Sequence, residues 1–135
     1  MFLFDTDILS NIIRPRPAQA LLERLENLHR AVQFTSAINV GEIYFGACRS
    51  PKKNQILKAF TASVFPNLTV LPFDAQSGCV FGQLKAELEK AGTRCSEPDL
   101  RIAAITIQHH LTLVSGNVRH FTRIPGLKVE NWLEA

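Results

Sequence analysis

Acidic side chains stand at three points of the chain that a fold could bring to one place. Asp5 directly follows the apolar run Phe2–Phe4, Glu42 lies within the apolar segment AINVGEIYFGAC, and Asp99 opens another apolar segment. Two carboxylates ~4 Å apart repel each other by roughly 4 kcal/mol at an effective dielectric constant of ~20. A divalent cation that takes oxygen ligands, such as Mg²⁺ or Mn²⁺, removes this cost. Such an ion also neutralises a phosphate group, so the acids indicate phosphodiester hydrolysis.

Each of these acids also has a purely structural interpretation. Asp5 would serve as the N-cap of the helix that follows it. Asp99 stands three residues after Ser96, which is the spacing of a capping box. Glu42 is the strongest candidate, because no broad polar face surrounds it on its helix. Asn117 follows an apolar strand, as Asp5 does, and is either a fourth polar residue of the site or a turn residue.

Six further residues near these positions are secondary candidates for the same site. They are Thr6, Asp7, Arg14, Glu97, Ser115 and Arg119. Asp7 equally fits the first turn of a helix, where the helix dipole favours an acid. The two hydroxyl residues either bind a ligand or only cap and turn the chain. The two arginines follow the candidate motifs and would contact phosphate, although an isolated surface arginine is usually only solvated.

The periodicity of the sequence predicts the elements that position these residues. Short apolar runs predict strands at Phe2–Phe4, Val32–Phe34, Leu68–Leu71, Leu111–Val114 and Leu127–Glu130. Helical spacing predicts helices over residues 8–13, 18–28, 37–48, 51–64, 76–90 and 98–109. Alternating strands and helices favour a three-layer α/β/α sandwich with a short, mainly parallel sheet of four to five strands. In such a sheet, ligands bind outside the carboxyl ends of the strands.

Length and composition predict one domain, spanning residues 1–135, and the 46% hydrophobic content excludes a disordered chain. No apolar stretch approaches the ~20 residues that span a bilayer, and we expect no signal peptide. Three widely spaced cysteines, Cys48, Cys79 and Cys95, predict reduced, buried thiols in a cytoplasmic protein rather than disulfides. The net charge of +3 permits a polyanionic partner such as nucleic acid.

At these residues the sequence resembles the PIN-domain ribonucleases, and within them the VapC-type toxins of bacterial toxin–antitoxin pairs. FLFDTDIL resembles the family's opening strand and acid, and INVGEIYFGA resembles its helix with a central glutamate. LPFDAQSGCVFGQLKAELEKAG resembles the link into the long fifth helix, and EPDLRIAAITIQHHLTLVSGNVRHFTRIPGLKVENW resembles the ending. Each motif alone is weak, whereas their order and spacing over essentially the whole chain are specific.

The resemblance implies a metal-dependent endoribonuclease that cleaves RNA, often at structured sites such as tRNA loops. It implies Asp5, Glu42 and Asp99 as ligands of Mg²⁺ or Mn²⁺, with Asn117 at the position of the family's fourth polar residue. Many members carry an acid there, and Asp7 and Glu97 could supply the missing negative charge. It also implies a homodimer and a cognate antitoxin protein that covers the active site.

Two other functions compete with this interpretation. An Asp-x-Asp after an apolar strand also suggests a phosphatase of the haloacid-dehalogenase type, in which Asp5 would be the nucleophile and Asp7 an acid/base. Only twenty residues follow Ser115, with Lys128 as their sole lysine, which leaves no place for the later motifs of that chemistry. The other alternative is a catalytically degenerate domain that binds RNA or a protein, and the retained acids argue against it.

Overall fold

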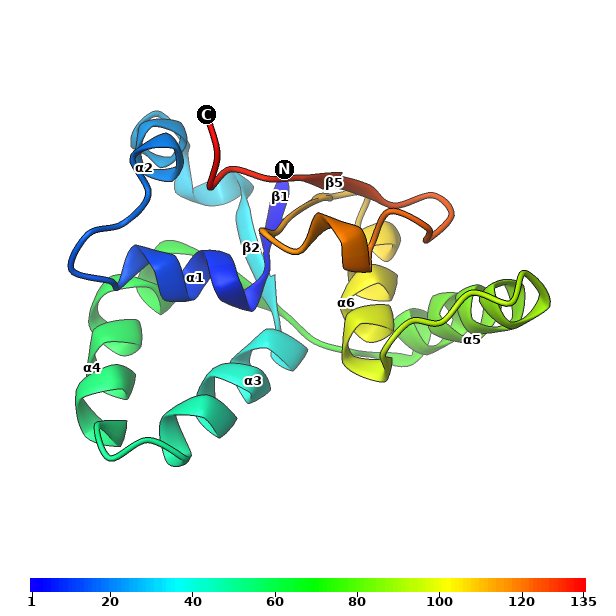
Figure 1. Cartoon of the computed structure of the whole chain (residues 1–135), viewed down its shortest axis with the longest axis horizontal. Coiled ribbons are helices and arrows are strands. Elements are labelled where there is room, and N and C mark those ends of the chain that lie inside the picture. The colour runs from blue at the N-terminus through cyan, green and yellow to red at the C-terminus, as the bar shows by residue number, and fades with distance from the viewer.

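Five parallel strands form the centre of the computed structural model, which describes residues 1–135 (Figure 1). The strands are β1 (Phe2–Phe4), β2 (Gln33–Ser36), β3 (Thr69–Leu71), β4 (Thr112–Val114) and β5 (Lys128–Glu130). They lie in the order β3-β2-β1-β4-β5, and every neighbouring pair is parallel. β1 is the middle strand of the sheet. Asp5 directly follows its carboxyl end, so it lies at the centre of the row formed by the carboxyl ends of the five strands.

Six helices connect the strands, and each corresponds to one predicted from the sequence. They are α1 (Thr6–Ile12), α2 (Gln19–Glu26), α3 (Ala37–Cys48), α4 (Lys53–Ser63), α5 (Ala75–Lys90) and α6 (Glu97–Gln108). Their ends fall within two residues of the predicted bounds, which is the usual uncertainty of a helix terminus. The bounds of α3 match the prediction because the Ser36 side chain accepts a hydrogen bond from the Asn39 amide and fixes the start of the helix.

The sheet separates two hydrophobic cores, because successive residues of a strand point to opposite faces. Leu3 of β1 packs with Leu113 in the core that α5 and α6 cover. Phe4 and Val114 belong to the other core, together with apolar residues of α1, α2, α3 and α4. Figure 1 shows the two groups of helices on opposite sides of the sheet, so the predicted three-layer α/β/α sandwich is confirmed.

Helix α6 is central, as its almost wholly apolar sequence predicts. Five consecutive residues, from Ile102 to Thr106, are buried. This packing fixes the start of the helix, and therefore the position of Asp99 in its first turn.

All three cysteines are free thiols, which agrees with the absence of disulfides expected from the sequence. The prediction that they are buried was wrong: Cys48 and Cys79 are exposed, and only Cys95 is half-buried. Cysteine is a small, weakly polar residue that tolerates both environments. Its exposure therefore depends on which face of the local structure it occupies, and the residue type alone does not predict it. None of the helices is both long and apolar enough to pass through a membrane.

Candidate functional site

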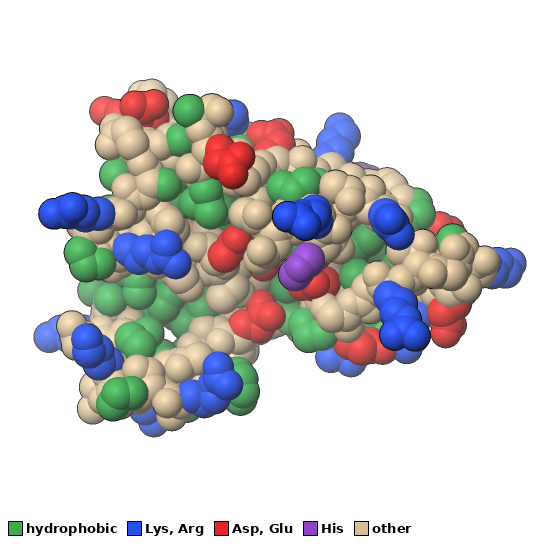
Figure 2. All heavy atoms as spheres, viewed as in Figure 1, with side chains coloured by type: hydrophobic (Ala, Val, Ile, Leu, Met, Phe, Trp, Pro, Cys, Tyr) green, Lys and Arg blue, Asp and Glu red, His purple; other side chains and the backbone are tan.

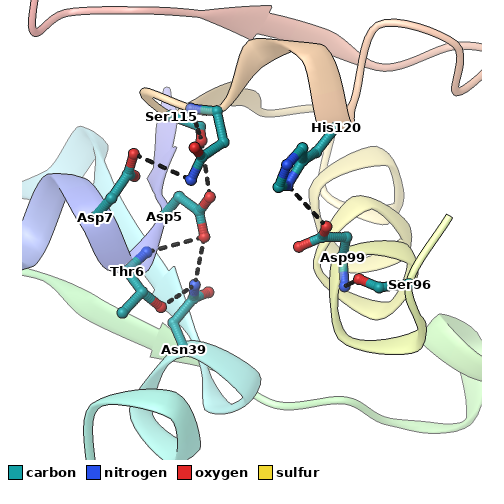
Figure 3. Close-up of polar contacts among 9 residues, drawn as sticks. Asp5, Thr6, Asp7, Asn39, Ser96, Asp99, Ser115 and His120 are labelled. Carbon is teal, nitrogen blue, oxygen red and sulfur yellow. Dashed lines mark hydrogen bonds and ion pairs between the residues drawn. The ribbon is translucent and has the colours of Figure 1, made fainter. Parts of the chain in front are cut away.

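Asp5 is a buried carboxylate that is held from three sides. Its Oδ1 atom accepts hydrogen bonds from the Thr6 amide over 2.9 Å and from the Asn39 side-chain amide over 3.0 Å, and its Oδ2 atom accepts one from the Ser115 hydroxyl over 2.8 Å (Figure 3). The residue is only 6% exposed. Asp5 therefore caps α1, as the structural interpretation held, and is also fixed at the strand end where a ligand would bind.

The electrostatic surroundings of Asp5 disfavour its charged form. The pKa of this carboxyl is raised from its ordinary value of 3.8 to about 6: burial is the largest cause, the nearby Asp7 and Glu42 act in the same direction, and hydrogen bonds from Ser115 and Thr6 act against it. No arginine or lysine forms an ion pair with Asp5, Asp7 or Glu42. The protein thus collects negative charge at the end of β1 without supplying a cationic side chain to balance it.

Asp7 also points back toward this sheet edge from the first turn of α1. Its Oδ2 atom accepts hydrogen bonds from the Gly116 amide over 2.8 Å and from the Asn117 side chain over 3.5 Å. Its Oδ1 atom is buried and has no hydrogen-bond partner. Burial is the main cause that raises the pKa of Asp7, and the charge of Arg14 acts in the opposite direction. A buried carboxylate oxygen without a donor is unusual in a folded protein, so Asp7 leaves one polar atom of the acidic cluster unsatisfied.

The loop after β4 needs a glycine to approach Asp7 this closely. A Cβ atom placed on Gly116 would lie 2.5 Å from Oδ2 of Asp7 and 2.7 Å from a methyl carbon of Leu133. The same loop carries Asn117, whose backbone amide donates a hydrogen bond to the Ser115 hydroxyl oxygen over 3.0 Å. Asn117 is therefore a residue of this loop whose side chain also lies beside Asp7.

Glu42 reaches the cluster from the second turn of α3. Its Oε1 atom accepts a hydrogen bond from the Thr6 hydroxyl over 2.6 Å. The Asn39 side chain donates to the same hydroxyl oxygen over 3.0 Å and also to Asp5, while its own carbonyl oxygen accepts from Ser36 over 2.5 Å. Sequence reasoning did not single out Asn39, although its spacing of three residues before Glu42 already placed both on one helix face.

Asp99 lies on α6, on the other side of the view from Asp5 and Asp7 (Figure 3). Its amide is capped by the Ser96 hydroxyl over 3.3 Å, whereas its carboxylate lies 3.4 Å from Nδ1 of His120. The side chain of Asp99 is 21% exposed. Ser96 thus provides the cap of α6, and the carboxylate of Asp99 lies against His120 instead.

Glu97 points away from the acidic cluster. Its carboxylate lies 2.7 Å from the Lys85 ammonium and 3.8 Å from the Arg101 guanidinium, and the hydrogen bond from Lys85 lowers its pKa. The structure therefore brings together Asp5, Thr6, Asp7, Glu42, Ser115 and Asn117, and it leaves Glu97 in a separate surface network.

The oxygen donors of the cluster fit a hard divalent cation, although the acids are not close enough together to coordinate one directly. No three histidine, cysteine, aspartate or glutamate side chains lie close enough together to hold a metal ion directly. The available donors are carboxylate and amide oxygens, one of them buried and unpartnered, and they carry uncompensated negative charge. Mg²⁺ prefers oxygen ligands and usually keeps several of its waters, so contacts through water suit this spacing.

Known proteins that resemble this chain share its whole length. The model of the PIN domain family matches residues 2–127. The chain is 35% identical to Ribonuclease VapC2 of Haemophilus influenzae over 98% of both sequences. It is 33% identical to the tRNA(fMet)-specific endonuclease VapC of Salmonella typhimurium over 97% of both.

Solved structures agree with these sequence matches. The crystal structure of VapBC2 from Rickettsia felis, bound to a DNA fragment from its promoter, contains a chain that is 31% identical, with a TM-score of 0.89 over 97% of this chain and 98% of that one. FitAcB from Neisseria gonorrhoeae superposes equally well, with a TM-score of 0.89 and 27% identity over 100% of both chains. The chain belongs to the PIN-domain family, among relatives that are VapC-type ribonucleases.

Proposed function

We propose that this protein is an endoribonuclease that depends on Mg²⁺ or Mn²⁺ and serves as the toxin of a toxin–antitoxin pair in the cytoplasm. The observation that carries the proposal is the buried Asp5, which three hydrogen bonds fix at the end of the central strand beside two more acids with no cationic partner. The names of its full-length relatives, ribonuclease and tRNA(fMet)-specific endonuclease, support RNA as the substrate and tRNA as the first RNA to test.

The proposed metal ligands are Asp5, Glu42 and Asp99, with some contacts through water. Asp5 and Glu42 are linked through the Thr6 hydroxyl and the Asn39 side-chain amide, so one hydrogen-bond network orients both carboxylates. Asp99 lies on the other side of the close-up, on α6. When bound, the ion would neutralise the scissile phosphate and lower the pKa of water. Asp7 and Asn117, which lie beside Asp5, would add oxygen ligands or hold water.

The chain's own residues supply positioning and charge for the reaction. The hydrogen bonds of Asp5 with Ser115 and Asn39 keep its carboxylate in one orientation, which in-line attack on a phosphate requires. A carboxylate of the cluster accepts a proton from the attacking water. Arg14 and Arg119 are the proposed phosphate contacts.

An antitoxin protein and a second copy of the chain are the proposed protein partners. A relative that is 29% identical over 90% of this chain is named Toxin FitB. The uncompensated acids around Asp5 form a natural site for an arginine or lysine of an antitoxin, because hydrogen bonds between charged groups are strong. Tyr44 and Phe45 of α3 are 44% and 62% exposed, and such exposed aromatics suit a homodimer interface.

Expression in a bacterial host tests the proposed function. Wild type, Asp5→Asn and the control Glu26→Gln, an exposed glutamate of α2 without an ion pair, are induced separately, and new RNA 5′ ends are mapped. We expect growth arrest and new ends with wild type and with the control, and neither with Asp5→Asn. Equal toxicity of Asp5→Asn and wild type would contradict the proposed role of the site.

A further inference from the structure

Three arginines line a cavity beside Asp99, and two of them, Arg94 and Arg123, have no role in the proposed chemistry. The cavity has a volume of about 300 Å³ and lies between the end of α5, the start of α6 and the segment that contains the short helix η3 (Val118–His120). Its charged lining consists of Arg94, Arg119, Arg123, His120 and Asp99. A concave surface that presents three guanidinium groups is electrostatically suited to an anion.

These three arginines have no acidic partner within the protein. The ion pairs of the chain involve Arg24, Lys85, Arg101 and His120 instead. All three arginines are exposed, and Asp99, the single acid of the lining, already lies against His120. The cavity is therefore positively charged, next to the negatively charged cluster around Asp5. Figure 2 shows acidic side chains near the middle of this face, with Lys and Arg side chains on both sides of them.

The rest of the lining also suits a nucleic acid strand. Leu88 and Ile124, which are both buried, contribute an apolar floor, while Thr93 and Ser96 contribute hydroxyl groups. A second cavity of about 490 Å³ is lined by Asn117, Arg119 and His120 among others. Because Arg119 and His120 belong to both cavities, the two are adjacent along one path that passes Asp99 and Asn117.

We propose that the cavity of Arg94, Arg119 and Arg123 binds a backbone phosphate of the RNA strand, next to the phosphate that is cleaved. The inference rests on the proposed ribonuclease function and extends it to the path of the substrate. Phosphate contacts fix the register and orientation of a strand but do not read its sequence. This cavity would therefore position many RNAs alike and set the direction in which the strand crosses the acids.

RNA binding by a catalytically silenced protein tests the inference directly. In an Asp5→Asn background, the affinity for a fluorescein-labelled single-stranded RNA 12-mer of mixed sequence is measured by anisotropy at several KCl concentrations. We expect the added change Arg94→Gln/Arg123→Gln to weaken binding about tenfold. The slope of log K against log[salt] should become shallower by about 0.7, the value for one phosphate contact in a single strand. The control Lys128→Gln, an exposed cation on β5, removes charge elsewhere and should leave the slope unchanged.

Cleavage by the active protein supplies the second measurement. With Asp5 present, the double change should raise KM for the RNA and leave kcat nearly unchanged, because it removes binding that is equal in the ground and transition states. If the double variant has the same RNA affinity, the same salt slope and the same KM as wild type, the inference is overturned. A variant that binds RNA normally but escapes neutralisation by a co-expressed antitoxin would also overturn it, because the cavity would then be a protein contact.

The two measurements separate this inference from the proposed function. If wild type cleaves RNA and the arginine changes have no effect, the inference fails and the ribonuclease proposal stands. If wild type cleaves no RNA with Mn²⁺ present, the ribonuclease proposal fails, whereas loss of RNA binding in the double variant would still support the phosphate site.

Discussion

The side-chain amide of Asn39 in α3 donates a hydrogen bond to Oδ1 of Asp5 at the end of β1, over 3.0 Å. The same amide donates to the Thr6 hydroxyl, which in turn donates to Glu42. Asn39 is completely buried. One side chain thus ties the helix that carries Glu42 to the strand end that carries Asp5, and it orients two of the proposed metal ligands at once.

Replacing Asn39 with alanine should therefore destabilise the protein and loosen the site. Loss of the side-chain amide leaves the buried Ser36 hydroxyl without its acceptor and removes one of the two donors to Oδ1 of Asp5, which costs about 1–3 kcal/mol in the free energy of unfolding. Urea denaturation of wild type and Asn39→Ala measures this cost. Asn54→Ala, at an exposed position of α4, is the matched control and should change stability by less than about 0.5 kcal/mol. A result for Asn39→Ala equal to that of Asn54→Ala would contradict the role assigned to Asn39.

The raised pKa of Asp5 predicts a pH dependence of stability in the metal-free protein. The folded protein holds the Asp5 proton up to about pH 6, whereas the unfolded chain releases it near the ordinary value of 3.8. The contribution of Asp5 to stability is therefore present below pH 3.8 and is lost as the pH rises through 6. With 1.36 kcal/mol for each pKa unit, the loss is about 3 kcal/mol.

Urea titrations between about pH 4 and pH 7.5 in EDTA, with wild type and Asp5→Asn, measure this dependence. The difference between the two proteins isolates Asp5 from the other titrating groups. Asparagine cannot ionise, so we expect the variant to gain stability relative to wild type as the pH rises. A difference that stays constant with pH would mean that Asp5 ionises as an exposed carboxyl does.

Divalent metal should stabilise the wild-type protein. A ligand that binds only the folded state, at about one hundred times its Kd, adds about 2.7 kcal/mol to the free energy of unfolding. Thermal melts with increasing Mn²⁺ should therefore show a rising Tm for wild type and for Glu26→Gln, and a much smaller rise for Asp5→Asn and Asp99→Asn. No change in the Tm of wild type at millimolar Mn²⁺ would favour the catalytically degenerate alternative.

Glu97 and Asp99 are separated by one residue, yet their substitutions should have different effects. Glu97 is exposed and paired with Lys85 and Arg101, and exposed ion pairs contribute little to stability. Glu97→Gln should therefore leave RNA cleavage and the metal-induced rise in Tm close to those of wild type, whereas Asp99→Asn should reduce both. Equal loss in the two variants would show that Glu97 takes part in the site.

The sequence predicted the fold well because its local signals agreed with one another. The strand Phe2–Phe4, the bounds of α3 and the apolar length of α6 each appear where periodicity places them. Strands alternating with helices allow few arrangements other than a parallel sheet. The prediction of a short, mainly parallel sheet of four to five strands is confirmed, and all five strands are parallel.

The site was predicted less completely, because side-chain directions depend on tertiary packing. The sequence placed Asp5 and Asn117 at strand ends, and the structure brings both beside Asp7. It could not reveal that Glu97 turns toward Lys85, which lies on α5, twelve residues earlier. Nor could it reveal that Arg94 and Arg123, far apart in sequence, line one cavity with Arg119. The match to the PIN family also leaves the haloacid-dehalogenase alternative for Asp5 and Asp7 without support.

Cleavage of RNA by the purified protein, with the metal removed and then restored, tests the central claim most directly. End-labelled tRNA is incubated with wild type in EDTA, then with excess Mg²⁺ or Mn²⁺, and with Asp5→Asn under the same conditions. We expect discrete new ends only for wild type with metal, and none in EDTA or with Asp5→Asn. Cleavage that persists in EDTA, or that Asp5→Asn performs as fast as wild type, would contradict a metal-dependent reaction at this cluster of acids.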